Sequence, residues 1–518
     1  SRGPGDVYKR QGSVVVAAPL SMANDVTTGG GLPGVNVVIR GTSTGTVTDL
    51  DGTYMINVPG PDAVLVFSYI GYVTMEITVD NRTILNVMLQ EDITQLEEIV
   101  VIGYGTQKKE DLTGAVAVVD VENFAKSAKG NVSKALQGQA AGVEVQGSGE
   151  PGGVPRVRIR GIGSFGSSEP LYVVDGVPIA NYMGVNTGEY GGSDSRTGGI
   201  TDLSPSDIES IQILKDASAA AIYGARGANG VVIITTKRGQ TGTLNIDYEG
   251  NFGFEYMPKR MEVTNREQFQ EMNNQARQND RNFLARANNP ASPYFIDSID
   301  TDWQSEVFTR GYVTDHALSL RGGNESSQFF ASINYFDQSG TMVGPPPHYT
   351  RYSVRLNGDQ QKGRFRFGQS IMYTHTNHDR LSNTQWAPPI YSTLLGIPTV
   401  AVYDENNPGG FGGGDDYIHD QICDNQVGFN YLRTINTKRY RLLAVVYGEL
   451  MIIDGLNYKI NLSYDRADWF NHEFIPVYEI GDRHTNPIAF LNEWRGENPY
   501  MIMEHTLSYK QVFGNHNV

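Results

Sequence analysis

The sequence predicts a mainly β fold in which a small β-sandwich is followed by an α/β region and then by a long antiparallel sheet. Short runs of β-branched and aromatic residues, separated by turn residues, occupy about residues 31–89. Gly-rich turns and short helical patterns come next, and regular alternation of apolar and polar residues begins near Thr243. The 518 residues give room for several domains of this kind.

Composition excludes several classes of protein. The formal net charge is −16, which argues against nucleic acid as a main partner. No apolar run reaches the ~18 residues that a membrane-spanning helix needs. With one cysteine, Cys423, the chain has no intramolecular disulfide framework, and its 9 scattered histidines form no metal-binding pattern. We therefore expect neither a cofactor nor a metal.

The amino-terminal residues, 1–23, are interpreted as an adapter-like and leader remnant. Ser1–Gly12 is polar without periodicity and resembles translated adapter sequence. Ser13–Ala23 is short and apolar and ends in small side chains. It is therefore either the tail of a secretory signal or a first strand.

The first predicted domain covers residues 24–90. Its strands are expected in VNVVIRG, GTYMINV, AVLVFSYIGY and TILNVML, and this density of strands and turns indicates a small β-sandwich. Asp49–Gly52 is too short for a calcium-binding loop and predicts a tight turn. The stretch LPGVNVVIRGTSTGTVTDLDGTYMINV resembles the carboxypeptidase-regulatory-like domain, which implies a transthyretin-like sandwich.

The α/β region contains two helical patterns and several short strands. A short helix is expected in Asn131–Gly138 and a buried strand in Val231–Thr235. Ser204 followed by Pro205 is typical of a helix start, so a helix is predicted over Pro205–Ala221.

One glycine-rich motif in this region resembles a dinucleotide-binding site, but the residues that follow it do not fit such a site. Gly161–Gly166 matches G-x-G-x-x-G, but a dinucleotide site needs a helix directly after it, and the strand-like LYVVDGVPI follows instead. Glu169 and Asp175 resemble a catalytic pair, yet carboxylates in turn-rich sequence are expected to be solvated or capping. With no nucleophile elbow and no oxyanion site, we predict no catalytic residues and no enzyme.

The carboxy-terminal part alternates with a period of two. Leu244, Ile246 and Tyr248 are separated by polar residues, and the same pattern recurs in several later segments. Such alternation fits a soluble sandwich as well as a membrane barrel. The polar face is charged, however, and a tight GGNESS turn contrasts with the long connection Asp379–Arg433. Short turns at one rim and long loops at the other favour an outer-membrane barrel.

Three motifs together point to a family. LEEIVVIGYGTQKKEDLTGAV, PRVRIRGIGSFGSSEPLYVVDGVPI and DIESIQILKDASAAAIYGARGANGVVIITTKRG resemble the SusC/RagA-type TonB-dependent outer-membrane transporters. The resemblance implies a TonB-box linker over residues 91–114, an α/β plug domain over 115–239 and the first part of an antiparallel transmembrane β-barrel over 240–518. Roughly eight or nine strands are expected, against 22 in complete barrels of this kind.

The same resemblance implies a function. It is TonB-dependent active import of oligosaccharides or peptides across the bacterial cell outer membrane, with a SusD-like surface lipoprotein as partner and the first domain in the periplasm. The alternative is a secreted or surface β-rich adhesion or binding protein. The sequence does not identify the ligand or the residues that contact it. Trp386, Tyr391 and Tyr403 in the long loop either stack on sugar rings or pack within the loop.

A short apolar stretch matches the position of the TonB box. It consists of Glu98, Ile99, Val100, Val101, Ile102 and Gly103. The resemblance implies that TonB adds an edge strand to it by β-augmentation, in which main-chain hydrogen bonds supply the affinity. The alternative is that Ile99–Ile102 forms an edge strand of the sandwich or of the plug.

Overall fold

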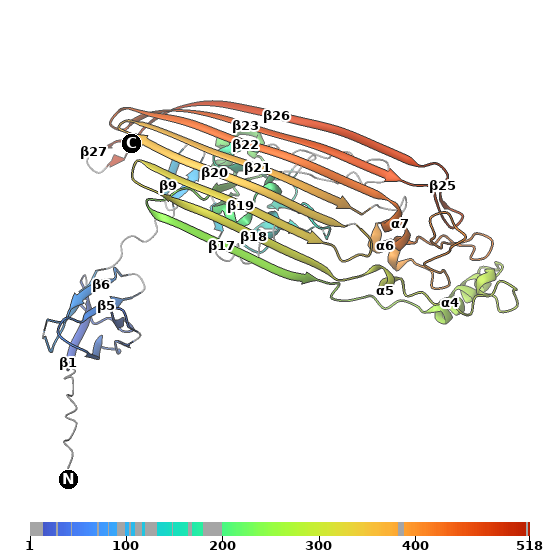
Figure 1. The fold of residues 1–518 in the computed structure, drawn as a ribbon, viewed down its shortest axis with the longest axis horizontal. Helices are drawn as coiled ribbons and strands as arrows, with labels where there is room; N and C mark the ends of the chain where they lie inside the picture. Colours follow the sequence, from blue (N-terminus) through green and yellow to red (C-terminus); the bar gives the residue numbers. More distant parts are fainter. Residues whose placement is uncertain are drawn as a thin grey trace, which may run out of the picture. The chain divides into compact units, whose positions relative to one another are not determined.

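In the computed structural model the chain divides into two compact units, residues 1–99 and residues 100–518, and each is described by itself. The element labels are those of Figure 1. The structure describes residues 14–26, 29–42, 44–69, 72–80, 82–90, 99–102, 105–108, 116–119, 132–147, 149–163, 168–179, 199–345, 347–381, 388–513 and 516–517.

The amino-terminal unit is a β-sandwich. One sheet has the strand order β4-β1-β7 and the other has the order β3-β2-β5-β6. Alternate residues of the strands face the partner sheet, so that Tyr54, Leu65 and Phe67 are among the buried core residues. The strands are β1 (Val14–Asp25), β2 (Asn36–Ile39), β3 (Gly45–Val47), β4 (Thr53–Val58), β5 (Val64–Ser68), β6 (Met75–Thr78) and β7 (Val87–Leu89).

The structure tests two predictions for this unit, the nature of Ser13–Ala23 and the turn at Asp49–Gly52. For Ser13–Ala23, the structure has a strand from Val14 onward, and β1 pairs antiparallel with β4 and parallel with β7. The tight turn predicted at Asp49–Gly52 is confirmed. The Asp49 carboxylate accepts backbone N–H bonds from Asp51 at 3.1 Å and from Thr53 at 2.8 Å.

The predicted plug lies in the second unit and is an α/β domain. Its main sheet has five strands in the order β10-β15-β16-β13-β14, and β11 and β12 form a separate pair. The central strands are buried on both faces. The elements are β10 (Val116–Val119), α2 (Val132–Ala135), β11 (Val143–Gln146), β12 (Arg156–Ile159), β13 (Leu171–Val174), β14 (Val177–Pro178), η2 (Gly199–Asp202), η3 (Pro205–Asp207), β15 (Ile208–Leu214), α3 (Ala217–Ala220), η4 (Ala221–Gly227) and β16 (Val231–Thr236).

The helix predicted for Pro205–Ala221 is wrong over most of its length. Within this range η3 and α3 are helical and Ala221 begins η4, but the seven residues of β15 between η3 and α3 form a strand. Ile211 and Ile213 are fully buried there, because β15 lies between β10 and β16. Burial of β-branched residues in a central strand outweighs a local helix-start signal. Ser204 makes no capping bond, and its hydroxyl donates to Asn334 at 3.1 Å.

Other expectations for the plug are confirmed. Helix α2 lies within Asn131–Gly138, and β16 covers the predicted strand Val231–Thr235. Strand β12 precedes the Gly161–Gly166 motif, and the next described element after it is strand β13. Of the motif, Gly161–Gly163 are described, and Gly161 has a φ of +86° that suits a glycine.

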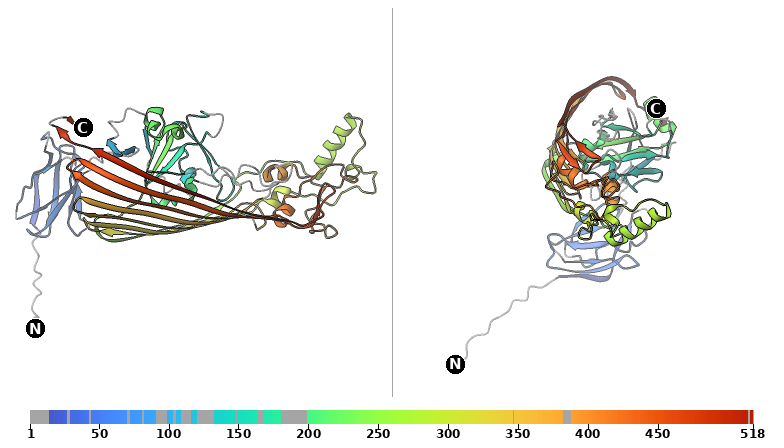
Figure 2. Two further views of the ribbon diagram at one scale, coloured as in Figure 1. Left: turned by 90° about the horizontal axis from the view of Figure 1, so that it is seen from above. Right: turned by 90° about the vertical axis from the view of Figure 1, so that its right-hand side faces the viewer.

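Strands β17 to β23 and strand β26 form one antiparallel sheet of eight strands, joined in sequence order. The sheet curls around the plug, as Figure 2 shows. Tight connections at one end contrast with long ones at the other, as predicted. The strands are β17 (Gly242–Glu255), β18 (Gly311–Gly323), β19 (Ser327–Ser339), β20 (His348–Lys362), β21 (Phe365–Arg380), β22 (Thr434–Ile453), β23 (Leu456–Ile475) and β26 (Phe490–Tyr509).

The two faces of this sheet differ in polarity. On β20, Tyr352, Val354 and Leu356 are 50%, 39% and 47% exposed, whereas Ser353 and Arg355 between them are buried. A soluble sandwich does the opposite and buries its apolar face. An apolar outer face around a polar interior is the arrangement of a membrane barrel. No helix among the described residues is long and apolar enough to cross a membrane.

The long connections form a folded assembly of their own. Trp303, Ile397, Phe429 and Ile480, from three different connections, share one buried core.

After the eight-stranded sheet come two short strands, β27 (Val512–Phe513) and β28 (His516–Asn517). The elements of the connections are α4 (Arg266–Asn279), η5 (Arg286–Asn288), α5 (Trp303–Val307), α6 (Pro389–Leu394), α7 (Gln426–Leu432), β24 (Tyr478–Ile480) and β25 (His484–Asn486).

Replacing Phe67 by Ala should destabilise the sandwich by about 3–5 kcal/mol, because the ring is fully buried and packs against Tyr54 at 5.5 Å. Met55 on the outer face of β4 is 56% exposed, and Met55→Ala should cost less than about 0.5 kcal/mol. Urea unfolding of residues 1–99 measures both. Equal losses would show that this core is not the one described.

Candidate functional site

The inner face of the eight-stranded sheet carries buried charges. Arg351 and Arg355 lie on β20, Arg439 and Arg441 lie on β22, and none of the four is more than 5% exposed. An isolated buried guanidinium costs several kcal/mol, so each of these side chains needs a counter-charge or hydrogen-bond acceptors. The plug supplies them at three levels along the strands.

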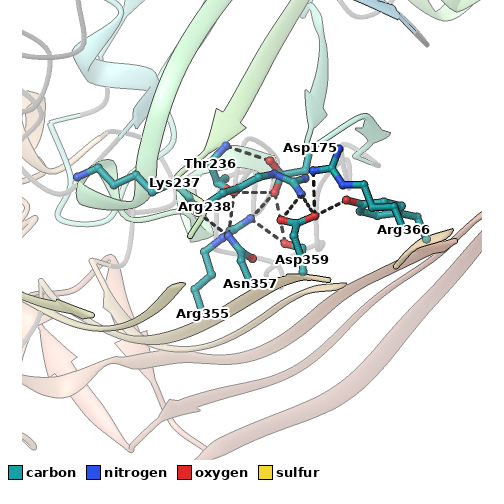
Figure 3. Close-up of polar contacts among 10 residues, drawn as sticks. Asp175, Thr236, Lys237, Arg238, Arg355, Asn357, Asp359 and Arg366 are labelled. Atoms are coloured by element: carbon teal, nitrogen blue, oxygen red, sulfur yellow. Dashed lines mark hydrogen bonds and ion pairs between the residues drawn. The ribbon is translucent and has the colours of Figure 1, made fainter. Parts of the chain in front are cut away.

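The lowest level, nearest the tight turns, is built around Asp175 (Figure 3). Asp175 and Gly176 have φ values of 49° and 85°, which fit an Asp-Gly turn between β13 and β14. The Asp175 carboxylate lies 2.5 Å from Arg355 Nη2 and accepts from Thr236 through N–H and hydroxyl at 2.9 and 2.7 Å. Burial opposes its ionisation, but Arg355 and Arg238 outweigh burial and hold the pKa of Asp175 below its usual value.

This result corrects the sequence interpretation of Asp175. It is neither a solvated nor a capping carboxylate, because its side chain is 3% exposed and ion-paired. Its pKa is held low by a fixed arginine, so it stays charged and is poorly suited to proton transfer. Glu169, the other acid considered, contributes its backbone carbonyl, which accepts from Asn229 at 3.4 Å.

The same level fixes the end of the plug where it leads into β17 (Figure 3). Arg238 Nη1 lies 3.2 Å from Asp359 Oδ2 on β20, and the Tyr447 hydroxyl also donates to Asp359. Asn357 Nδ2 donates to the backbone carbonyl of Lys237 at 2.6 Å. Two side chains of β20 thus hold the last residues of the plug.

The middle level is built around Asp202, at the end of η2. Its carboxylate lies 3.0 Å from Arg441 Nη1 and 3.3 Å from Arg439 Nη2, and Arg441 also pairs with Asp465 of β23 at 2.7 Å. Arg351 donates to the carbonyl of the residue before Asp202 at 2.9 Å. Burial opposes ionisation of Asp202, but Arg439 and Arg441 outweigh it and lower the pKa.

The upper level is built around Glu150, in the connection between β11 and β12. Arg380, the last residue of β21, donates to both carboxylate oxygens at 3.3 Å, and His378 Nε2 lies 3.7 Å away. The neighbouring Gly152 N–H donates to Gln338 Oε1 at 3.3 Å. Burial opposes ionisation of Glu150, but the charge of Arg380 and the hydrogen bonds that it donates outweigh burial and lower the pKa of Glu150.

Apolar contacts accompany these charged levels. Met372 of β21 and Leu443 and Val445 of β22 belong to the same buried cluster as the plug core. The arrangement can therefore position one domain inside another without performing chemistry. Removing one partner of a buried ion pair costs about 3–5 kcal/mol, so the plug has one strongly preferred position.

The predicted TonB box is only partly described. Ile99–Ile102 form strand β8, which pairs with β9 (Gly105–Lys108) in a two-stranded sheet. Glu98 and Gly103 lie outside the described residues. The sequence alternatives placed this strand at the edge of the sandwich or of the plug, and among the described strands it belongs to neither sheet.

The other residues singled out by the sequence lie apart from the charged levels. Trp386 is outside the described residues. Tyr391 and Tyr403 are 55% and 61% exposed, and the Tyr403 ring also packs against Phe411 at 5.5 Å. Burial raises the pKa of the Cys423 thiol to about 12. No group of three or more metal-ligating side chains occurs in the described part of the chain.

Sequence reasoning recognised that one face of the alternating strands is charged but did not pair its arginines with plug carboxylates. The signal is visible in RYSVRLNGD, Arg351–Asp359, where charges stand at inward positions of a strand. Their partners come from residues 150–200 positions away in some cases, such as Arg355 and Asp175 at 180. Only the fold brings such groups together.

The comparisons with known proteins agree with this geometry. Residues 23–101 match the model of the CarboxypepD_reg-like domain, and residues 108–231 match the TonB-dependent receptor plug domain. The chain is 31% identical to TonB-dependent receptor P3 of Formosa agariphila over 98% of this chain and 48% of that protein. It is 35% identical to TonB-dependent receptor SusC of Bacteroides thetaiotaomicron over 75% of this chain and 36% of that protein.

The chain belongs to the SusC/RagA type of TonB-dependent receptors. A solved structure of the RagAB peptide importer in its open-open state matches with a TM-score of 0.65 and 25% identity, covering 80% of this chain and 47% of that chain. The SusC/RagA-type chain thus spans about half the length of these relatives or less. The predicted fold class is confirmed: mainly β, with a plug and part of an antiparallel barrel.

Asp175→Ala should loosen the plug by about 3–5 kcal/mol, because Arg355 is left buried without its partner. Adding Arg355→Met should recover much of that loss. Hydrogen exchange of β13 and β16 amides in the detergent-solubilised receptor measures it. As a control, breaking the exposed Arg466–Glu497 pair at 2.8 Å should leave this protection unchanged, because exposed ion pairs add little stability. Additive losses in the double variant would contradict the pairing.

The plug contacts should tolerate mild acid. Asp175, Asp202 and Glu150 all have lowered pKa values, so their contribution to stability is complete above their unfolded pKa values of about 4 and is lost only as pH falls through the lower folded values. Amide protection of β13 and β16 should therefore stay constant from about pH 8 to pH 5. Loss of protection near pH 6 would instead indicate control by a histidine.

Proposed function

We propose that the receptor containing this chain imports oligosaccharides or peptides across the bacterial outer membrane, driven by TonB. The observation that carries the proposal is the polarity of the sheet: apolar side chains outside, and a charged inner face occupied by the plug. A sheet with an apolar outer face is suited to contact with lipid. A charged interior that is filled by a plug is suited to a passage for solutes that the plug closes. The RagAB peptide importer, which the chain resembles, supports peptides as a class of cargo.

The outer face supports a position in the outer membrane. His316, Tyr335, Tyr352, His375 and Tyr440 lie directly opposite one another on five successive strands, toward the long-loop ends. Their rings lie within 6.4 Å of each other from strand to strand. Rings with polar tips favour the boundary between hydrocarbon and headgroups. The amino-terminal sandwich then belongs in the periplasm.

The proposed division of labour follows the domain order. Residues 24–90 form the periplasmic sandwich, 91–114 the linker with the TonB box at Glu98–Gly103, 115–239 the plug and 240–518 the first barrel strands. Ligand binds over the plug and the long connections, with a SusD-like surface lipoprotein as lid. The match of the plug model to residues 108–231 supports the third of these assignments.

The mechanism needs no covalent step. TonB pairs with the box and pulls, and the plug rearranges as its ion pairs with the strands exchange for water. Charged groups are well solvated when they separate, so each level can open without exposing a large apolar surface. The apolar contacts of Met372, Leu443 and Val445 are the part that resists this exchange.

Deleting Glu98–Gly103 from the full-length receptor should abolish uptake of its ligand, because TonB then has no strand to pair with. Ligand binding should remain within about twofold of the parent, because the loops and plug are untouched. Deletion of residues 109–114, six residues of the same linker, is the length-matched control and should transport. Unchanged uptake after the first deletion would refute the assigned role.

A further inference from the structure

Two tryptophans lie on the inner face of the last two strands of the eight-stranded sheet. The plug contacts this face through Arg226, which donates to the Tyr500 hydroxyl at 3.2 Å, and Ile502 packs against the plug core. From Tyr500 toward the loop end, the inward positions of β23 and β26 stand directly opposite one another, Trp469 facing Gly496 and Asn471 facing Trp494. We call five residues of this surface the tryptophan wall: Trp469, Asn471, Trp494, Gly496 and Asn498.

The Trp469 ring leans across the neighbouring strand and rests on its backbone. A Cβ atom built on Gly496 would lie 2.2 Å from Trp469 Cζ2 and 2.3 Å from Cε2, so the indole fills the space over this glycine. Aromatic side chains cover glycines in other sheets in the same way. The side of the indole that is turned away from the sheet faces the interior.

A second aromatic ring on this sheet shows what complete use of such a ring looks like. Tyr447 leans over Gly368 in the same manner, but its hydroxyl donates to Asp359 and Lys459 Nζ lies 4.4 Å from its ring centroid. Trp469 is only half-buried, and in the described part of the chain no cation or second ring stacks on it. Packing within the chain therefore accounts for one side of Trp469.

Asn471, beside Trp469 on β23, has an unused donor. Its side chain is 2% exposed, and its Oδ1 accepts the Thr437 hydroxyl at 2.7 Å. Its Nδ2 has no acceptor among the described residues. A buried donor without an acceptor costs free energy, so a ligand oxygen that reaches Nδ2 would be bound favourably.

The charged side chains around the wall are not available to a ligand. Arg439, opposite Trp469 on β22, pairs with Asp202 at 3.3 Å, and Asp465 pairs with Arg441 at 2.7 Å. Glu473, farther along β23, is 1% exposed. What the wall offers is aromatic surface and neutral amides. This chemistry fits a neutral ligand rich in hydroxyl groups better than the charged ends of a peptide.

We propose that the tryptophan wall is a binding subsite for a neutral oligosaccharide. The apolar C–H face of one sugar ring covers Trp469, and its neighbour in the chain lies against Trp494. Ring hydroxyls accept from Asn471 Nδ2 and exchange hydrogen bonds with the half-buried Asn498. This inference rests on the proposed function and narrows its cargo to oligosaccharides.

Binding to the detergent-solubilised full-length receptor tests the subsite. The probes are a panel of neutral gluco-, manno-, galacto- and xylo-oligosaccharides and a library of random peptides, measured by calorimetry. We expect an oligosaccharide of the panel to bind the parent, and Trp469→Ala to weaken its binding about tenfold. Trp469→Tyr keeps an aromatic surface and should lose less. Gly496→Ala keeps the indole but displaces it from the strand, and should also weaken binding about tenfold.

Gly448→Ala is the matched control. It adds the same methyl group to the outer face of β22, where the new Cβ would meet Ile460 Cγ2 at an ordinary 3.7 Å. Its affinity for the oligosaccharide should stay within about twofold of the parent.

Three results would overturn the subsite: unchanged affinity in Trp469→Ala, binding of peptides without any oligosaccharide, or binding of neither probe. The proposed function is judged separately by uptake. If deletion of Glu98–Gly103 leaves uptake intact while Trp469→Ala loses the oligosaccharide, import driven by TonB is refuted and the subsite stands. If the deletion abolishes uptake while Trp469→Ala binds like the parent, the import stands and the subsite is refuted.

Discussion

The pairing of buried arginines on the sheet with carboxylates of the plug is the constraint on which the second unit depends. Strand alternation turns every second side chain inward, and on β20 and β22 several of these are guanidinium groups. Asp175 and Asp202 make their burial tolerable. The sheet therefore requires the plug in its interior, while its outward positions can be apolar.

Ion pairs add little net stability over apolar packing, but they specify a single position. That property suits a domain that stays in place until it is pulled. In the proposed mechanism the pull arrives through β8 and reaches the plug sheet at β10, an edge strand. Two of the anchors lie elsewhere, on the β13–β14 turn and directly after β16. The anchored part can therefore stay in place while β10 is loaded, and the plug need not leave as one body.

Local sequence predicted those elements whose pattern and burial agree. The alternating strands, the turn at Asp49 and strand β16 are examples, because each side chain's preference matches its final surroundings. The prediction of a helix over Pro205–Ala221 was wrong because the helix-start signal is local, whereas β15 is stabilised by neighbouring strands on both sides. Strand β9 was missed because Gly-Thr-Gln-Lys has no strand pattern of its own and forms one by pairing with β8.

The sequence by itself determined the family, the order of the domains along the chain and the polarity of each strand face, because motifs and two-residue periodicity are properties of neighbouring residues. Tertiary structure decided which charges meet. Asp175 could not be assigned to Arg355 in advance, because 180 residues separate them and a carboxylate after a strand looks the same whether it faces water or a guanidinium. The curling of the sheet around the plug selects one partner, since a buried charge must find one.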